Sequence, residues 1–274
     1  MTDANIFYLL SIFDNNDCKS IFNSFSEDEF TVIYTKEIEY ENSIHTAYFV
    51  FYSDLKKINC TLNAFILKIN RFLLSSNYHF FLIYDLSLKQ IIPYVSDYPI
   101  FSYYSHICVL TNYTYPSKLK RKHKKATERY MFLSGKKAIL FIEKALHLIE
   151  KTDYYVPNTK THEYFNILTK YFTKNYTYVV IALNNNAPCG IMCGFKNKKS
   201  VYMLCHFYDP LSCKNYINNG LYYSFIELCK QKHIESICFG SSYIHDSCLI
   251  HFKDYYSTEK KIYFSLIIPS ANLF

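Results

Sequence analysis

The sequence predicts an α/β (α+β) fold with a mixed, mostly antiparallel sheet and helices on both of its faces. The stretch Tyr176–Phe264 supports this, because its apolar runs and turns follow the order β-β-β-α-β-α-β. Half of the 274 residues are apolar, which suffices for one large core or two small ones. No internal repeat is evident in the sequence, but segments 29–115 and 160–268 are compatible with two half-similar α/β units. The chain is therefore expected to be either one fused unit or two tandem α/β halves.

The first part of the chain, residues 1–115, is expected to form one half. A short apolar run at 5–13 predicts a strand or edge element, and an acidic polar loop follows it. Aromatic and β-branched residues predict further strands at 29–35, 46–52, 79–85, 90–99 and 101–110. The strands at 79–85 and 90–99 read as a hairpin, with Pro93 at an edge or an early end. Between the strands at 46–52 and 79–85, apolar residues at helical spacing predict a helix over 55–72 that Ser53 caps.

Residues 116–174 are expected to be a helical connector. Pro116 precedes a basic helix at 118–129, and Gly135 separates it from an amphipathic helix over 136–150. The apolar face of that second helix contains Ile139, Ile142, Leu146 and Ile149. After a loop, a third helix is predicted at 162–172, and residues 175–274 form the second half.

Charge and cysteine usage indicate a soluble cytoplasmic protein. The formal charge of +7 is concentrated between Lys118 and Arg129, which hold seven basic residues and one Glu. The ten cysteines form no CxxC pair, and most of them lie in apolar strands or helices, as in a reducing compartment. We find neither a signal peptide nor an apolar run long enough to cross a membrane.

The helix start at Asn218-Asn219-Gly220-Leu221 is the first candidate site. Unpaired N–H groups at a helix N-terminus favour a phosphate or pyrophosphate, and a glycine there permits close approach to the backbone. An ordinary turn and helix cap would have the same residues. The order of strands around the motif favours the functional interpretation.

These elements resemble the GCN5-related N-acetyltransferase (GNAT) fold: the strands YTYVVIAL, IMCGF and VYMLCHFY, the helix start at Gly220, and the strand IESICFG. The C-terminal half more narrowly resembles the FemAB-like and BioF2-like acyltransferases, which have a basic helix like 118–129 and an earlier, degenerate copy of the domain. The resemblance spans roughly Phe30 to Ile268, mostly as an order of elements.

The sequence departs from the family pattern at two places. The family's phosphate loop has Arg or Gln, two residues, then Gly-x-Gly or Gly-x-Ala, whereas Tyr216–Tyr222 contains one glycine. The final Tyr-Lys or His-Lys near a glycine is represented by His251-Phe252-Lys253. Both departures suggest that the donor is bound less tightly or is not free acyl-CoA.

The resemblance implies the following site. Acyl-CoA or acetyl-CoA would be the co-substrate, with no metal. The backbone of Leu204, Cys205 and Phe207 would pair with its pantetheine arm, and Asn218–Leu221 would hold its pyrophosphate. Direct transfer to an amine needs a base, an oxyanion donor and an acid for the thiolate. His206 and Asp209 are the candidate bases and Tyr243 the candidate acid, although each also fits a structural role.

Ser241 and His245 follow the strand that ends near Gly240, where α/β sheets bind ligands, so we assign them to the substrate. A Ser/His hydrolase would need a Gly-x-Ser-x-Gly elbow, which is absent from the sequence. The histidines and cysteines nearby lack the spacing of a zinc site.

The predicted function is therefore transfer of an acyl group from acyl-CoA, or from a carrier-protein thioester, to a small-molecule or peptide amine. One alternative is a FemAB-like transferase that uses aminoacyl-tRNA, with the basic helix 118–129 contacting tRNA or a carrier protein. That helix has no interleaved aromatic residue to stack on bases, so it could also be an ordinary solvated helix. Another alternative is a non-catalytic binding protein with the same fold.

Overall fold

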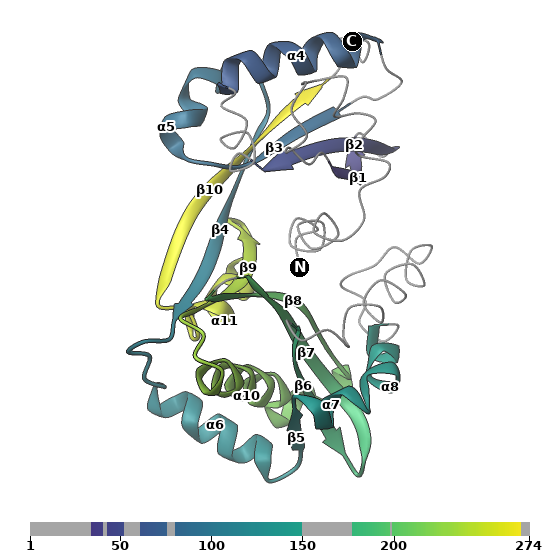
Figure 1. Ribbon diagram of the computed structural model, residues 1–274, viewed down its shortest axis with the longest axis vertical. Coiled ribbons are helices and arrows are strands. Elements are labelled where there is room, and N and C mark those ends of the chain that lie inside the picture. Colours follow the sequence, from purple (N-terminus) through teal and green to yellow (C-terminus); the bar gives the residue numbers. More distant parts are fainter. Residues whose placement is uncertain are drawn as a thin grey trace. The chain divides into compact units, whose positions relative to one another are not determined.

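The computed structural model describes residues 34–40, 43–51, 61–75, 80–149, 177–197 and 199–269 (Figure 1). The chain divides into two compact units. Unit 1 contains Ser105–Lys260, and unit 2 contains the described residues up to Tyr104 and from Lys261 onward. The strand at 5–13, the cap Ser53 and the helix at 162–172 lie outside the described residues. The predicted domain limits, 1–115, 116–174 and 175–274, remain predictions.

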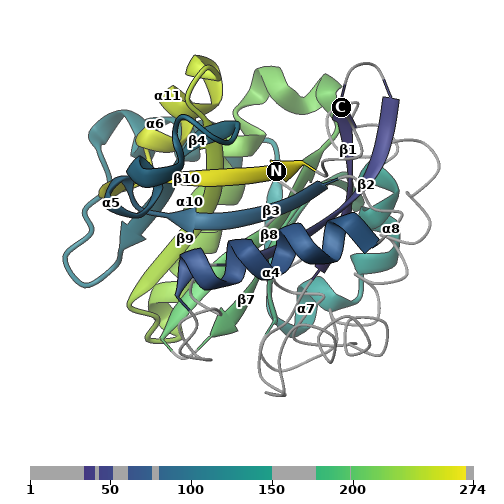
Figure 2. The ribbon, with the colours of Figure 1, turned by 90° about the horizontal axis from the view of Figure 1, so that it is seen from above.

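Unit 2 combines strands with one long helix. Its elements are β1 (Tyr34–Tyr40), β2 (Ser43–Phe51), α4 (Leu62–Ser75), β3 (Phe80–Leu86), α5 (Leu88–Ile91), η1 (Ile92–Tyr94) and parts of β4 (Ile100–Val109) and β10 (Glu259–Pro269). β1 pairs antiparallel with β2, β2 parallel with β3, and β3 antiparallel with β10. α4 runs alongside β3 (Figure 2), and Phe65 packs edge-on against Phe81 at 5.8 Å between ring centroids. The described part of the predicted helix 55–72 is confirmed.

The predicted strand at 90–99 is wrong, because the chain forms α5 and η1 there. The Gln90 side chain turns back, and its Oε1 accepts hydrogen bonds from the Ser87 backbone N–H at 2.7 Å and from the Ser87 hydroxyl at 2.6 Å. Such a contact starts a helix. Pro93 then lies in the first turn of η1, where its missing N–H costs nothing. This local capping outweighs the β propensity of the isoleucines.

Unit 1 contains the element order that the sequence predicts most clearly. Its elements after β4 are α6 (Ser117–Thr127), β5 (Met131–Ser134), α7 (Lys136–Ile139), α8 (Ile142–Leu146), η2 (His147–Ile149), β6 (Thr177–Asn184), β7 (Ala187–Asn197), β8 (Ser200–Tyr208), η3 (Pro210–Asn215), α10 (Ile217–Gln231), β9 (Ser236–Tyr243) and α11 (Ser247–Asp254). The strands lie in the order β9-β8-β7-β6-β5, parallel between β8 and β9 and antiparallel elsewhere. The predicted β-β-β-α-β-α-β order is confirmed.

Helices cover both faces of these strands. α6 and α10 lie on one side and α7 and α8 on the other (Figure 1). On the α10 side, Leu221, Phe225 and Ile226 join Val180 and Met192 in one core. The turn between β6 and β7 is a tight one, since Asn185 and Asn186 both have positive φ, which Asn tolerates.

The predicted amphipathic helix over 136–150 is wrong in its continuity. The chain makes three short pieces there, α7, α8 and η2. Ile139, predicted on the apolar face, is 38% exposed, whereas Ala138, Ile142 and Ala145 are buried. The residues before Gly135 form β5, which pairs with β6 and was not predicted as a strand.

The structure also bears on the expectations about the cysteines and about membrane-spanning segments. Cys108, Cys189, Cys193 and Cys229 are buried and lie outside disulfides, as the apolar context of most cysteines predicted, whereas Cys238 is half-buried. None of the described helices has both the length and the apolar character needed to span a bilayer.

Candidate functional site

The parallel strands β8 and β9 form the centre of the candidate site. Their ladder contains three pairs, from Ser200 opposite Ser236 to Tyr202 opposite Cys238. Both strands continue beyond it, β8 to Tyr208 and β9 to Tyr243. The sequence predicted that β8 separates from its neighbour over Leu204–Phe207, and the ladder between the two strands ends just before that stretch.

A β-bulge lies at the same point of β8. The pairing of β8 with β7 shifts by one residue between Cys193 and Gly194, so Leu204 is the extra residue of the bulge. Gly194 makes this geometry accessible, because a Cβ atom there would come within 2.6 Å of the Tyr202 carbonyl oxygen. Bulges redirect the backbone and are frequent beside active sites.

The N-terminus of α10 follows β8 and η3. Tyr216, the residue before the helix, is in the left-handed conformation with φ +62° and makes no side-chain cap hydrogen bond. The Gly220 N–H donates to the Tyr216 carbonyl at 3.1 Å and is the first intrahelical donor of α10. The N–H groups that precede it at the start of the helix have no acceptor within the helix. The Asn219 side-chain amide donates to the Tyr256 hydroxyl, so Asn219 anchors the helix start to the end of α11.

Gly220 has a packing role that the sequence did not reveal. A Cβ atom at this position would lie 2.1 Å from Cζ of Phe132, a residue of β5. The glycine therefore lets an aromatic ring lie directly against the first turn of α10. Close packing explains this glycine without a ligand, and its predicted contact with a pyrophosphate remains a prediction.

His206 is surrounded by polar and aromatic groups on the α10 side of β8. Its ring meets that of Tyr222 edge-on at 5.2 Å, and the Asn218 side chain at the helix start lies near enough to affect its protonation. Burial lowers the pKa of His206 to about 4, and the ammonium of Lys253 lowers it further, whereas the neighbouring Asn218 side chain opposes the shift. The imidazole is therefore neutral at pH 7.

Two polar atoms of this pair lack a partner within the described part of the chain. They are Nε2 of His206 and Oδ1 of Asn218, and both are shielded from solvent. Buried polar atoms in native proteins are nearly always hydrogen-bonded, so such orphans point to a missing partner. The structure thus joins two predicted residues, one from β8 and one from the α10 start.

Lys253 is the functional candidate that sequence reasoning did not select. This residue of α11 is 3% exposed, and its Nζ donates to the backbone carbonyl of Ser241 in β9 at 2.8 Å. Burial lowers the pKa of Lys253 to about 8, although Cys238 and Asp246 raise it. Among the described residues no carboxylate is in hydrogen-bonding contact with Lys253, which is uncommon for a lysine buried this deeply. The one sequence signal was the family-like His251-Phe252-Lys253.

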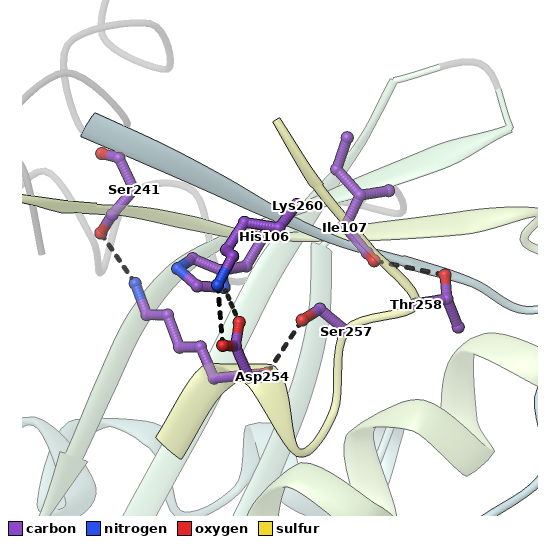
Figure 3. Close-up of polar contacts among 8 residues, drawn as sticks. His106, Ile107, Ser241, Asp254, Ser257, Thr258 and Lys260 are labelled. Atoms are coloured by element: carbon purple, nitrogen blue, oxygen red, sulfur yellow. Dashed lines mark hydrogen bonds and ion pairs between the residues drawn. The ribbon is translucent and has the colours of Figure 1, made fainter. Parts of the chain in front are cut away.

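Asp254, the residue after Lys253, contacts two other strands, β4 and β10. Asp254 Oδ1 lies 3.3 Å from Nδ1 of the fully buried His106 in β4, and its Oδ2 accepts from Lys260 in β10 at 2.9 Å (Figure 3). The pKa of His106 falls to about 4, first through burial and then through the Lys253 ammonium, with Asp254 opposing. None of these three residues was selected from the sequence.

The other predicted residues have local structural roles or lie at the surface. Asp209 accepts a hydrogen bond from the Leu211 N–H at 3.1 Å and so caps η3. Tyr243 is 52% exposed at the end of β9, and His245 is exposed in the turn that follows. Ser241 is buried and provides its carbonyl to Lys253. Their predicted roles remain predictions.

The basic helix is placed beside two tyrosines. The ammonium groups of Lys122 and Lys125 lie 5.9 and 5.8 Å from the ring centroid of Tyr216, and those of Lys118 and Lys122 lie 5.3 and 5.4 Å from that of Tyr255. These are cation–π distances. Aromatic groups that the helix lacks in its own sequence are thus provided by the residues before α10 and after α11.

Over the residues that the structure describes, no group of three or more His, Cys, Asp or Glu side chains is arranged to hold a metal ion.

Comparison with known proteins identifies the fold. No protein-family model matches the chain, and no curated protein matches it. Among solved structures, a conserved protein of unknown function from Bacteroides thetaiotaomicron has a TM-score of 0.61 at 11% identity, over 98% of each chain. A GCN5-related N-acetyltransferase from Sphaerobacter thermophilus has a TM-score of 0.54 at 8% identity, over 86% of this chain and 76% of the other.

FemX has a TM-score of 0.51 at 8% identity, over 93% of this chain and 96% of the other. The chain therefore has a GNAT/FemAB-like, mixed α/β fold with mostly antiparallel strands, as the sequence predicted. This is a fold of acyltransferases.

Proposed function

We propose that this protein transfers an acyl group from a thioester, acyl-CoA or an acyl carrier protein, to an amine by direct attack. The observation that carries the proposal is the bulge at Leu204, two residues after the last pair of the β8–β9 ladder. A bulge turns peptide groups out of the ladder at the point where two parallel strands stop pairing. An extended donor chain with amide groups of its own fits such a backbone.

The donor's phosphates are assigned to the start of α10. The N–H groups of Ile217, Asn218 and Asn219 precede the first intrahelical donor, and Tyr216 provides no side-chain cap. The helix dipole adds a partial positive charge there. Gly220 contributes through its packing on Phe132, which sets the position of this turn.

His206 and Lys253 are suited to the two charges of the reaction. The attacking nitrogen forms a bond to the thioester carbonyl carbon and loses a proton, and neutral His206 can accept that proton through its orphaned Nε2. Lys253, cationic at pH 7, can stabilise the oxyanion. The carbon–sulfur bond then breaks, and the thiolate takes a proton, for which Tyr243 at the end of β9 remains the predicted acid.

A second candidate, an aminoacyl-tRNA donor, is favoured by the lysines of α6. Lys118, Lys122 and Lys125 lie against Tyr216 and Tyr255, next to the proposed phosphate site. No described acidic side chain forms an ion pair with these three lysines. Such a surface fits the phosphates and unstacked bases at an RNA end.

Binding experiments separate the candidates. Acetyl-CoA and longer acyl-CoAs should raise the melting temperature of the full chain and should bind in calorimetric titration. His206→Asn and Lys253→Met should keep that binding and lose transfer to amine acceptors, whereas exposed Lys89→Ala should keep both. Binding of aminoacyl-tRNA without binding of any acyl-CoA would favour the second candidate. If neither donor binds, the transferase proposal is wrong and a non-catalytic binding protein becomes the better interpretation.

A further inference from the structure

The end of α11 holds two neighbouring side chains in fixed and different directions. Lys253 reaches the Ser241 carbonyl of β9, and Asp254 reaches His106 of β4 and Lys260 of β10. Figure 3 shows the Asp254 carboxylate directed toward His106 and Lys260. Three separate strands thus hold two consecutive residues of one short helix.

The chain immediately after the helix is tied to β4 as well. The Thr258 N–H donates to the Ile107 carbonyl at 2.8 Å, and the Val109 N–H donates to the Thr258 hydroxyl at 2.9 Å. The Ser257 hydroxyl and N–H both donate to the Lys253 carbonyl, at 3.1 and 3.0 Å. The backbone of Lys253 is therefore fixed relative to β4, the strand that contains His106.

His106 is placed to complete this attachment from inside the protein. Its side chain is fully buried, and its Nδ1 is within 3.3 Å of Asp254 Oδ1, whereas Lys260 approaches the other oxygen from a position 35% exposed. Because burial lowers the pKa of His106 to about 4, the ring is neutral and its contact with Asp254 adds no second cation near the buried Lys253 ammonium. The contact most shielded from water is thus the one between His106 and Asp254.

We propose that His106 is a positioning residue: through Asp254 it fixes the last turn of α11, so that the Lys253 amine stays buried against the Ser241 carbonyl. The inference rests on the proposed function, in which Lys253 faces the reacting thioester. It assigns no contact with substrate to His106. Its prediction concerns the environment of one amine, which can be measured without any substrate.

The test is trace acetylation of the native full chain with acetic anhydride at a series of pH values, read as the modified fraction of each lysine by peptide mass spectrometry. In the wild type, Lys253 should be modified slowly, with a midpoint near pH 8, and exposed Lys232 should report the ordinary rate. In His106→Leu, Lys253 should react roughly tenfold faster because the turn opens. Its midpoint should move toward the usual lysine value.

Rescue distinguishes positioning from general loosening. His106→Asn keeps an N–H donor close to the place of Nδ1 and should restore the slow rate and the midpoint near pH 8. A destabilised control with its change in another part of the core, Leu119→Ala, should leave the Lys253 midpoint unchanged at equal loss of melting temperature. If His106→Leu does not fold, Asp254→Asn and Lys260→Met provide the comparison, and the Asp254 variant should show the larger effect.

The proposal is overturned if Lys253 has the same rate and midpoint in folded His106→Leu as in the wild type, or if Asn and Leu at position 106 behave alike. Because the labelling uses no acyl donor, its failure is distinct from failure of the transferase proposal. If the labelling results are as expected but the wild type transfers no acyl group, only the transferase proposal is wrong.

Discussion

The ring of Phe132 lies so close to Gly220 that a Cβ atom at position 220 would be 2.1 Å from the ring's Cζ atom. This contact joins β5 to the first turn of α10 and sets where the proposed phosphate site begins. It also means that a large substitution at Gly220 tests folding as much as ligand binding.

Gly220→Ala should destabilise the protein, although alanine normally favours a helix over glycine. The added methyl group collides with Phe132, and overpacking of this kind costs about 1–3 kcal/mol. Phe132→Leu should cost stability alone but relieve most of the Gly220→Ala penalty in the double variant. Urea unfolding of the four proteins measures the coupling, and purely additive effects would contradict the contact.

Lys253→Met should raise stability at pH 7 while abolishing transfer. Burial lowers the pKa of Lys253 from 10.5 to about 8. At pH 7 the amine is charged in both states, and the folded state disfavours that charge relative to the unfolded chain. The shift corresponds to roughly 3 kcal/mol, of which the lost Ser241 hydrogen bond offsets about 1 kcal/mol.

The pH dependence of that gain checks its origin. Below pH 8 the penalty is present in full, and it disappears as the pH rises toward the ordinary lysine value near 10.5, where both states are neutral. The stability advantage of Lys253→Met over the wild type should therefore shrink between pH 8 and 10.5. A constant difference over this range would show that the amine is not the cause.

Acid should destabilise the wild type well before its carboxylates titrate. His106 and His206 both have a pKa lowered from 6.5 to about 4, so the unfolded chain binds their protons first as the pH falls. Stability present above pH 6.5 is lost as the pH falls toward 4, by up to roughly 3 kcal/mol for each histidine. Urea midpoints at unit pH steps measure the loss, which should be smaller in His206→Asn.

The lysines of α6 that lie over Tyr216 should matter more for polyanions than lysines elsewhere. Lys122→Glu with Lys125→Glu should weaken binding of a tRNA pool and lower the slope of log affinity against log salt by about 0.7–0.9 for each phosphate that the helix no longer neutralises. The double control Lys89→Glu, Lys232→Glu has the same charge change at exposed positions. If both double variants weaken tRNA binding equally, the effect comes from net charge and not from the position of the α6 lysines.

The β-β-β-α-β-α-β order and the α/β class were predictable from the sequence, because hydrophobic periodicity and turn residues act over short stretches. The strand β8, the α10 start and the basic helix were all placed within a few residues. The prediction of a strand at 90–99 was wrong because two local signals competed. The isoleucines after Gln90 favour a strand, but the Ser87–Gln90 contact starts a helix.

Which side chains come together in a candidate site depends on long-range packing. The bulge at Leu204 depends on pairing with β7, and the burial of Lys253 depends on β9, neither of which leaves a local pattern in the sequence. Tyr216 and Tyr255 reach the lysines of α6 from positions far along the chain. Gly220, which suggested a phosphate, is explained first by Phe132. Burial and contact join residues that are distant in sequence, whereas periodicity and capping depend on residues that are close in sequence.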